Sequence, residues 1–181
     1  GVYDPDPGSY IEFNNKDITK EPSHIIGSLG LARTFQLLRL YQDMSVINNV
    51  MSGYHTRVPY TFTEAVLGRK KIWDQEKKIK NEMMELLSFV GLADYAEMNA
   101  SELSGGQRRL LVLARAIAGK PKLLMLDEPA AGLSPVNVDN LMKIIMQLKD
   151  RFGLTLIIIE HILKVVMDTC NSVTVFDHGQ K

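Results

Sequence analysis

The sequence predicts an α/β fold in which helices cover a parallel sheet, and two observations support this prediction. The apolar runs at 122–126 and 154–159 are continuous, which is typical of strands covered on both faces. Between them, residues 134–153 show apolar side chains at helical spacing. Strands that alternate with helices in this way form parallel sheets with right-handed crossovers.

Composition restricts the kind of protein that this chain can be. Its 181 residues are enough for one domain with a sizeable core. Lys and Arg total 21, as do Asp and Glu, so no net charge favours nucleic acid, and we expect no nucleic-acid partner. The longest apolar run, 154–159, is far shorter than the ~20 residues of a membrane span. A single cysteine, Cys170, and no apparent signal peptide lead us to expect a cytoplasmic location.

The first 36 residues predict short elements separated by turns. Alternating side chains indicate a strand, turn residues with asparagine indicate a hairpin, and Pro22 favours the start of a helix. The expected elements are a strand at 9–13, a turn at 14–17, a helix that ends near Gly27 or Gly30, and a strand at 31–35 that leads into Gln36.

Residues 37–100 predict an all-helical insertion between the two parts of the α/β unit, 1–36 and 101–181. Ser45 is expected to cap a short helix that runs to Met51, and a second short helix is expected at 63–68. A long helix closing at Gly91 has one apolar face: Ile72, Ile79, Met83, Leu86, Leu87 and Val90. We expect Trp73 to pack against this insertion.

Residues 101–181 alternate between helix and strand. Glycine and proline mark most of the boundaries between these segments. The expected elements are helices at 107–118, 135–152 and 162–169, and strands at 122–126, 154–159 and 172–176.

A Ser-Gly-Gly turn before the 107–118 helix is a candidate anion site. In Leu103-Ser104-Gly105-Gly106-Gln107, the first backbone N–H groups of the helix have no acceptor within it, and the helix dipole adds positive charge there. The alternative is an ordinary helix cap followed by two permissive glycines.

Four polar side chains follow predicted strands, at the edge of the sheet where ligands of α/β proteins bind. Asp127 is suited to hold Mg²⁺ through its water shell, and Glu128 to polarise a water molecule that attacks a phosphate. His161 is suited to donate a hydrogen bond to phosphate, and Gln36 to contact both Mg²⁺ and water. The alternatives are a surface turn at 127–128 and a helix cap at His161.

Taken in order, these elements resemble the conserved motifs of ABC-type ATPases. Gln36, 103–107, 123–128 and His161 resemble the Q-loop, signature, Walker B and switch histidine of that family. Finer features are similar to the ATPase subunits of branched-chain amino acid importers: residues 33–36, 44–50, 127–135 and 174–179. The D-loop departs from the commoner Ser-Ala-Leu-Asp form, because residues 131–134 are Ala-Gly-Leu-Ser.

The resemblance implies a P-loop NTPase (RecA-like) fold in which 1–36 and 101–181 form the ATPase core and 37–100 a helical subdomain. It implies that two subunits enclose two ATP molecules with Mg²⁺, and that the γ-phosphate of the partner's nucleotide is bound by Ser104, Gly105, Gly106 and Gln107. Glu128, His161 and Gln36 would be catalytic, and Asp127 and Gln36 would serve Mg²⁺. The helical subdomain would offer a groove to a membrane permease, at the inner face of the cell membrane.

A P-loop of the form G-x-x-x-x-G-K-[ST] does not occur in the sequence. The resemblance would place residues 1–3 just after the P-loop helix, so we expect a chain without the P-loop strand that is inactive by itself. Two other interpretations stay open: the ATPase of a lipopolysaccharide-export system, and a non-catalytic binding module.

Overall fold

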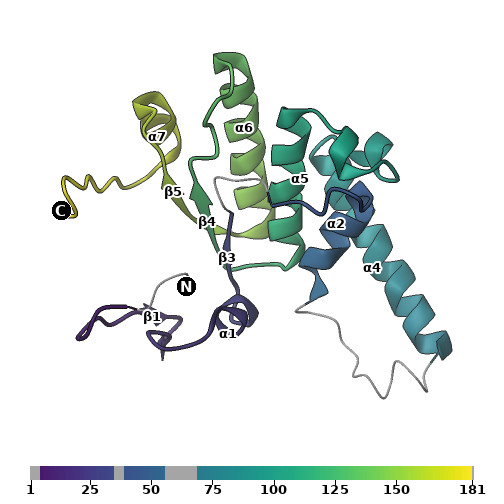
Figure 1. Ribbon diagram of the computed structural model, residues 1–181, viewed down its shortest axis with the longest axis horizontal. Helices are drawn as coiled ribbons and strands as arrows, with labels where there is room; N and C mark the ends of the chain where they lie inside the picture. Colours follow the sequence, from purple (N-terminus) through teal and green to yellow (C-terminus); the bar gives the residue numbers. More distant parts are fainter. Residues whose placement is uncertain (1–4, 35–38, 56–68, 181) are drawn as a thin grey trace.

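A three-stranded parallel sheet lies at the centre of the computed structural model, which describes residues 5–34, 39–55 and 69–180. The strands are β3 (Leu31–Arg33), β4 (Leu123–Asp127) and β5 (Thr155–Ile159), in the order β3-β4-β5. All three run in the same direction, as Figure 1 shows, with Leu124 beside both Ala32 and Leu156. The predicted parallel α/β sheet is therefore confirmed.

Helices α5 (Gly105–Ala118), α6 (Pro135–Phe152) and α7 (Leu163–Thr169) alternate with β4 and β5. Side chains of α5 and α6 share one core cluster with Leu124 and Leu126 of β4, which are almost completely buried. The residue after α6 is Gly153, with φ 61°, a left-handed conformation that glycine adopts at little cost. Glycine at this position thus ends α6 and turns the chain into β5.

The helical region contains α2 (Val46–Gly53), α4 (Arg69–Phe89) and two 3₁₀ turns, Ala93–Tyr95 and Ala100–Glu102. Side chains from α2 and α4 lie in the same core cluster as those of α5, and α4 extends beyond that cluster (Figure 1). The predicted apolar face of α4 is buried: Ile79, Met83, Leu86, Leu87 and Val90. Trp73 is 73% exposed, so the expectation that it packs is wrong. The helix expected at 63–68 and the side chain of Ile72 lie outside the described residues.

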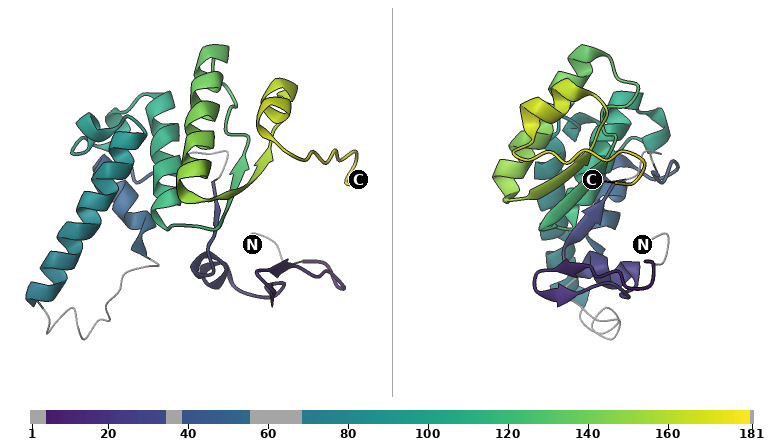
Figure 2. Two further views of the ribbon diagram at one scale, coloured as in Figure 1. Left: turned by 180° about the vertical axis from the view of Figure 1, so that it is seen from behind. Right: turned by 90° about the vertical axis from the view of Figure 1, so that its left-hand side faces the viewer.

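The amino-terminal part consists of a small hairpin and one short helix. Strands β1 (Glu12–Phe13) and β2 (Lys16–Asp17) pair antiparallel, and α1 spans Ser23–Ser28. Asn14 and Asn15 both have positive φ, which suits the tight turn between the strands. Figure 2 shows the hairpin and α1 at the end of the molecule where β3 and β4 begin.

Two predictions about strands are wrong. Residues 172–176 form no hydrogen-bonded β-ladder. A segment becomes a strand only when a neighbouring segment pairs with its backbone, and the periodicity of the segment says nothing about such a neighbour. In the 154–159 run, Ile157 is 44% and Ile159 54% exposed, so β5 is not covered on both faces among the described residues.

Close packing of α2 on α5 depends on Gly53. A Cβ atom at this position would lie 2.0 Å from the Arg115 carbonyl oxygen of α5. We therefore expect Gly53→Ala to lower the free energy of unfolding by about 1–3 kcal/mol, measured by urea denaturation. Gly27→Ala is the matched control, because Gly27 also lies in a helix but has nothing within 4 Å of the added atom. Equal stability of the two variants would contradict this account of the helix contact.

Candidate nucleotide site

Two consecutive carboxylates stand where β4 ends. Asp127 is the last residue of the strand, and its Oδ2 accepts a hydrogen bond from the Arg33 guanidinium of β3 at 2.9 Å. Glu128 leaves the strand with φ 45°, a conformation that is uncommon for residues other than glycine. Its N–H still donates to the Ile159 carbonyl of β5 at 2.9 Å. The sheet therefore holds the Glu128 backbone in a strained conformation at its edge.

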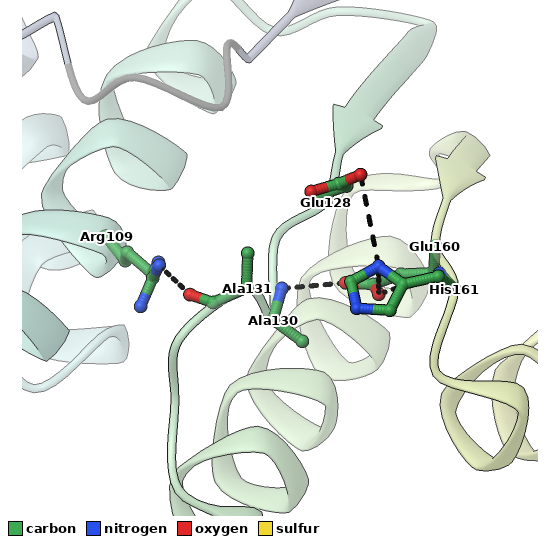
Figure 3. Close-up of polar contacts among 6 residues, drawn as sticks. All are labelled: Arg109, Glu128, Ala130, Ala131, Glu160 and His161. Atoms are coloured by element: carbon green, nitrogen blue, oxygen red, sulfur yellow. Dashed lines mark hydrogen bonds and ion pairs between the residues drawn. The ribbon is translucent and has the colours of Figure 1, made fainter.

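Glu128 and His161 face one another across the ends of β4 and β5 (Figure 3). The Oε1 atom of Glu128 lies 3.9 Å from Nδ1 of His161. Their side chains are 32% and 69% exposed, so both remain accessible from solvent. A carboxylate and an imidazole in this arrangement are suited to polarise a water molecule and to donate to an anion. The structure thus brings together two of the residues that the sequence singled out.

Glu160 takes part in this arrangement, although it is not among the site residues expected from the sequence. Its side chain is fully buried, and Oε1 accepts a hydrogen bond from the Ala130 N–H at 2.8 Å. Arg109 of α5 donates to the neighbouring carbonyl of Ala131, so polar contacts from two sides hold the loop after Glu128 (Figure 3). The signal in the sequence was an acidic residue directly after an apolar run.

The Ser-Gly-Gly turn forms the N-terminus of α5. Ser104 Oγ accepts from the Gln107 N–H, and Gln107 Oε1 accepts from the Ser104 N–H, which makes a reciprocal capping box. Gly105 and Gly106 are the first two helical residues, where the N–H groups have no acceptor within the helix. This end of α5 lies at the same end of the molecule as the carboxyl ends of the strands (Figure 1). The helix cap and the candidate anion site are therefore the same turn.

Neither glycine of the turn is required by the structure around it. No positive φ is found at Gly105 or Gly106, and a Cβ atom at either position would meet nothing within 4 Å. Glycine lowers helix stability relative to alanine because its backbone loses more conformational freedom on folding. The space beside the turn is open to a group outside this chain.

The residues at the strand ends suit a metal ion that arrives with its own ligands. Within 5–34, 39–55 and 69–180, no three His, Cys, Asp or Glu side chains gather closely enough to hold a metal ion. Asp127 offers one carboxylate, already paired with Arg33. Because Mg²⁺ commonly keeps several waters and uses substrate phosphates as ligands, one carboxylate fits a nucleotide-bound Mg²⁺. Gln36, the other expected Mg²⁺ residue, lies outside the described residues.

Comparison with known proteins decides the family. The model of the ABC transporter family matches residues 1–131. The chain belongs to this family. It is 32% identical over 179 residues to the high-affinity branched-chain amino acid transport ATP-binding protein BraF of Pseudomonas aeruginosa. The matched region covers 99% of this chain and 70% of BraF. It is also 35% identical over 183 residues to a probable branched-chain amino acid transport ATP-binding protein, LivG, of Archaeoglobus fulgidus. That match covers 99% of this chain and 68% of LivG.

Solved structures agree with this assignment. A crystal structure of an ATP-binding cassette of an ABC transporter in its ADP conformation matches with a TM-score of 0.76 and 30% identity. The match covers 94% of this chain and 66% of the solved chain. The P-loop NTPase fold and the ATPase class expected from the sequence are thus confirmed at the level of the family. None of the helices in the described part of the chain has the length and apolar character of a membrane span.

Proposed function

We propose that this chain is part of the ATP-binding subunit of an ABC importer for branched-chain amino acids, and that it couples ATP hydrolysis to transport. The curated relatives reported above support an amino acid importer. The observation that carries the proposal is the Glu128–His161 pair, which presents a general base and a phosphate-contacting donor side by side at the ends of two parallel strands.

The turn at the start of α5 supplies the second half of the proposed site. Ser104, Gly105, Gly106 and Gln107 bind the γ-phosphate of an ATP held by a second ATPase subunit. Unpaired N–H groups and the helix dipole attract the anion, and the missing side chains let it approach the backbone. Glycines that cost helix stability without being needed inside the chain are accounted for by such a ligand.

In the proposed site, Glu128 accepts a proton from the attacking water and His161 donates a hydrogen bond to the γ-phosphate. Asp127 and Gln36 serve Mg²⁺, and Gln36 also contacts the water. The Mg²⁺ ion, when bound with ATP, supplies electrostatic stabilisation of the phosphate oxygens. Asp127 must share its carboxylate between Mg²⁺ and Arg33, which makes Arg33 part of the proposed site.

Residues 37–100 act as a helical subdomain that receives the permease. A cavity of about 420 Å³ lies between β3, α2 and α5, and its described lining contains no carboxylate. Arg39, Arg115 and Tyr41 lie on its wall, so it offers basic and aromatic contacts to a short helix. Docking there places the subunit peripherally on the cytoplasmic face of the membrane.

Reconstitution tests the proposed function. We expect the complete subunit that contains this chain, purified with its permease and placed in liposomes with the cognate binding protein, to hydrolyse ATP faster when leucine, isoleucine or valine is present. Lysine is the control amino acid and should have no effect. Absence of any ATP hydrolysis, or copurification with an export permease in place of an importer, would contradict the proposal.

A further inference from the structure

We propose that Glu160 is a positioning residue that orients Glu128 and His161; the inference rests on the ATPase function proposed above. Glu160 is not among the catalytic or binding residues that the sequence led us to expect. Its carboxylate accepts hydrogen bonds from backbone N–H groups on both sides of the site. Glu160 therefore acts on Glu128 and His161 through the backbone and has no direct part in the reaction.

Burial shows that the Glu160 carboxylate has a structural task. Its side chain is 0% exposed, and a buried carboxylate is costly unless its oxygens are hydrogen-bonded. Both oxygens accept from backbone groups: Oε1 from the Ala130 N–H at 2.8 Å and Oε2 from the His161 N–H at 3.3 Å. One side chain therefore ties the loop after β4 to the segment after β5.

The two backbone groups flank the residues that would do the chemistry. Ala130 lies two residues after Glu128, and the second hydrogen bond is to His161 itself. Glu160 Oε2 also lies 4.0 Å from Nδ1 of His161, close to the 3.9 Å that separates this nitrogen from Glu128. With Nδ1 facing both carboxylates, Nε2 is the ring nitrogen left for a phosphate (Figure 3).

The loop between these residues is held from its other side as well. Arg109 of α5 donates to the Ala131 carbonyl, one residue beyond the Glu160 contact. Because α5 begins with the Ser-Gly-Gly turn, Glu160 and Arg109 join the phosphate-binding helix to the Glu128–His161 pair through a single loop. Movement of this loop would shift the general base relative to the histidine.

The test compares Glu160→Ala with Glu160→Gln in the complete subunit that contains this chain, assembled with its permease. Glutamine keeps one oxygen for the Ala130 N–H, whereas alanine removes both acceptors. We expect Glu160→Ala to lower kcat by about 10- to 100-fold, with KM for ATP changed by less than about threefold, because misplacement affects the chemical step. Glu160→Gln should recover a substantial part of kcat. Glu97→Ala is the control, since that carboxylate is 75% exposed and pairs with Lys80 at the surface.

A second measurement separates this inference from the proposed function. In nucleotide-free protein, we expect Glu160→Gln to speed hydrogen exchange of the His161 amide and to shift the His161 imidazole resonances, with the Ala130 amide largely unchanged. Wild-type kcat in Glu160→Ala, a loss confined to KM, or unchanged His161 exchange and resonances would overturn the inference. A wild-type protein that hydrolyses no ATP, yet shows these His161 changes, would refute the proposed function and leave Glu160 as the residue that orients the pair.

Discussion

In the complete ATPase subunit that contains this chain, replacing Glu128 with glutamine is expected to reduce ATP hydrolysis by about two to three orders of magnitude while ATP binding persists. Glutamine keeps the size of the side chain but cannot accept the proton of the attacking water, and general-base catalysis contributes about 10²- to 10⁴-fold. Because the Glu128 backbone is held by its hydrogen bond to Ile159, the variant should keep the loop conformation. Phosphate release measures the rate, and equilibrium binding of labelled ATP measures affinity.

Glu97→Gln is the matched control for this experiment, because it makes the same chemical change at a side chain on the surface, 75% exposed. It should hydrolyse ATP at the wild-type rate. If Glu128→Gln retained more than about a tenth of wild-type activity, Glu128 would not be the general base, and the argument from its 3.9 Å approach to His161 would fail.

Gly105→Asp is expected to change stability and activity in opposite directions. An acid in the first turn of a helix interacts favourably with its dipole, by roughly 0.3–1 kcal/mol, and α5 has no acid there. A Cβ atom added at Gly105 meets nothing within 4 Å, so the fold should accept a side chain there. At the same turn, a carboxylate would repel the γ-phosphate of a partner's ATP, and hydrolysis should fall below about a hundredth of the wild-type rate. Urea denaturation and phosphate release measure the two effects.

Asn48→Asp provides the control, because it adds an acid at an exposed position in the first turn of α2, a helix that also lacks an acid there. It should raise stability slightly and leave ATP hydrolysis unchanged. A Gly105→Asp variant that hydrolyses ATP normally would show that the open space beside this turn does not receive a phosphate.

Local signals in the sequence located most elements of the fold. Ser45 and Ser104 were recognisable as helix caps, and each does accept a hydrogen bond from the third residue of its helix. The features that were predicted wrongly, or not predicted, depend on neighbouring segments about which local sequence patterns carry no information. Residues 172–176 look like a strand but have no ladder, and Asn49, a polar residue, is fully buried because its amide binds the Tyr41 and Met44 carbonyls.

The site could be predicted in part for the same reason. Glu128 and His161 follow apolar runs, and parallel strands bring such residues to one edge of a sheet, so their proximity follows from the fold. The ion pair between Asp127 and Arg33 joins positions 94 residues apart, and no sequence spacing predicts it. Glu160 could not be predicted, because a single acidic residue after a strand is typical of the surface and only the structure shows that its side chain is buried.

The proposed site is complete only when two subunits meet around the nucleotide, so the decisive measurement is the oligomeric state of the Glu128→Gln variant of the complete subunit with Mg-ATP. Sedimentation of this variant should show a monomer without ATP and a dimer that holds two ATP molecules when ATP and Mg²⁺ are present. Adding Gly105→Asp to it should abolish the dimer. A sedimentation profile that ATP leaves unchanged, or a dimer that forms equally well with Gly105→Asp, would contradict the account.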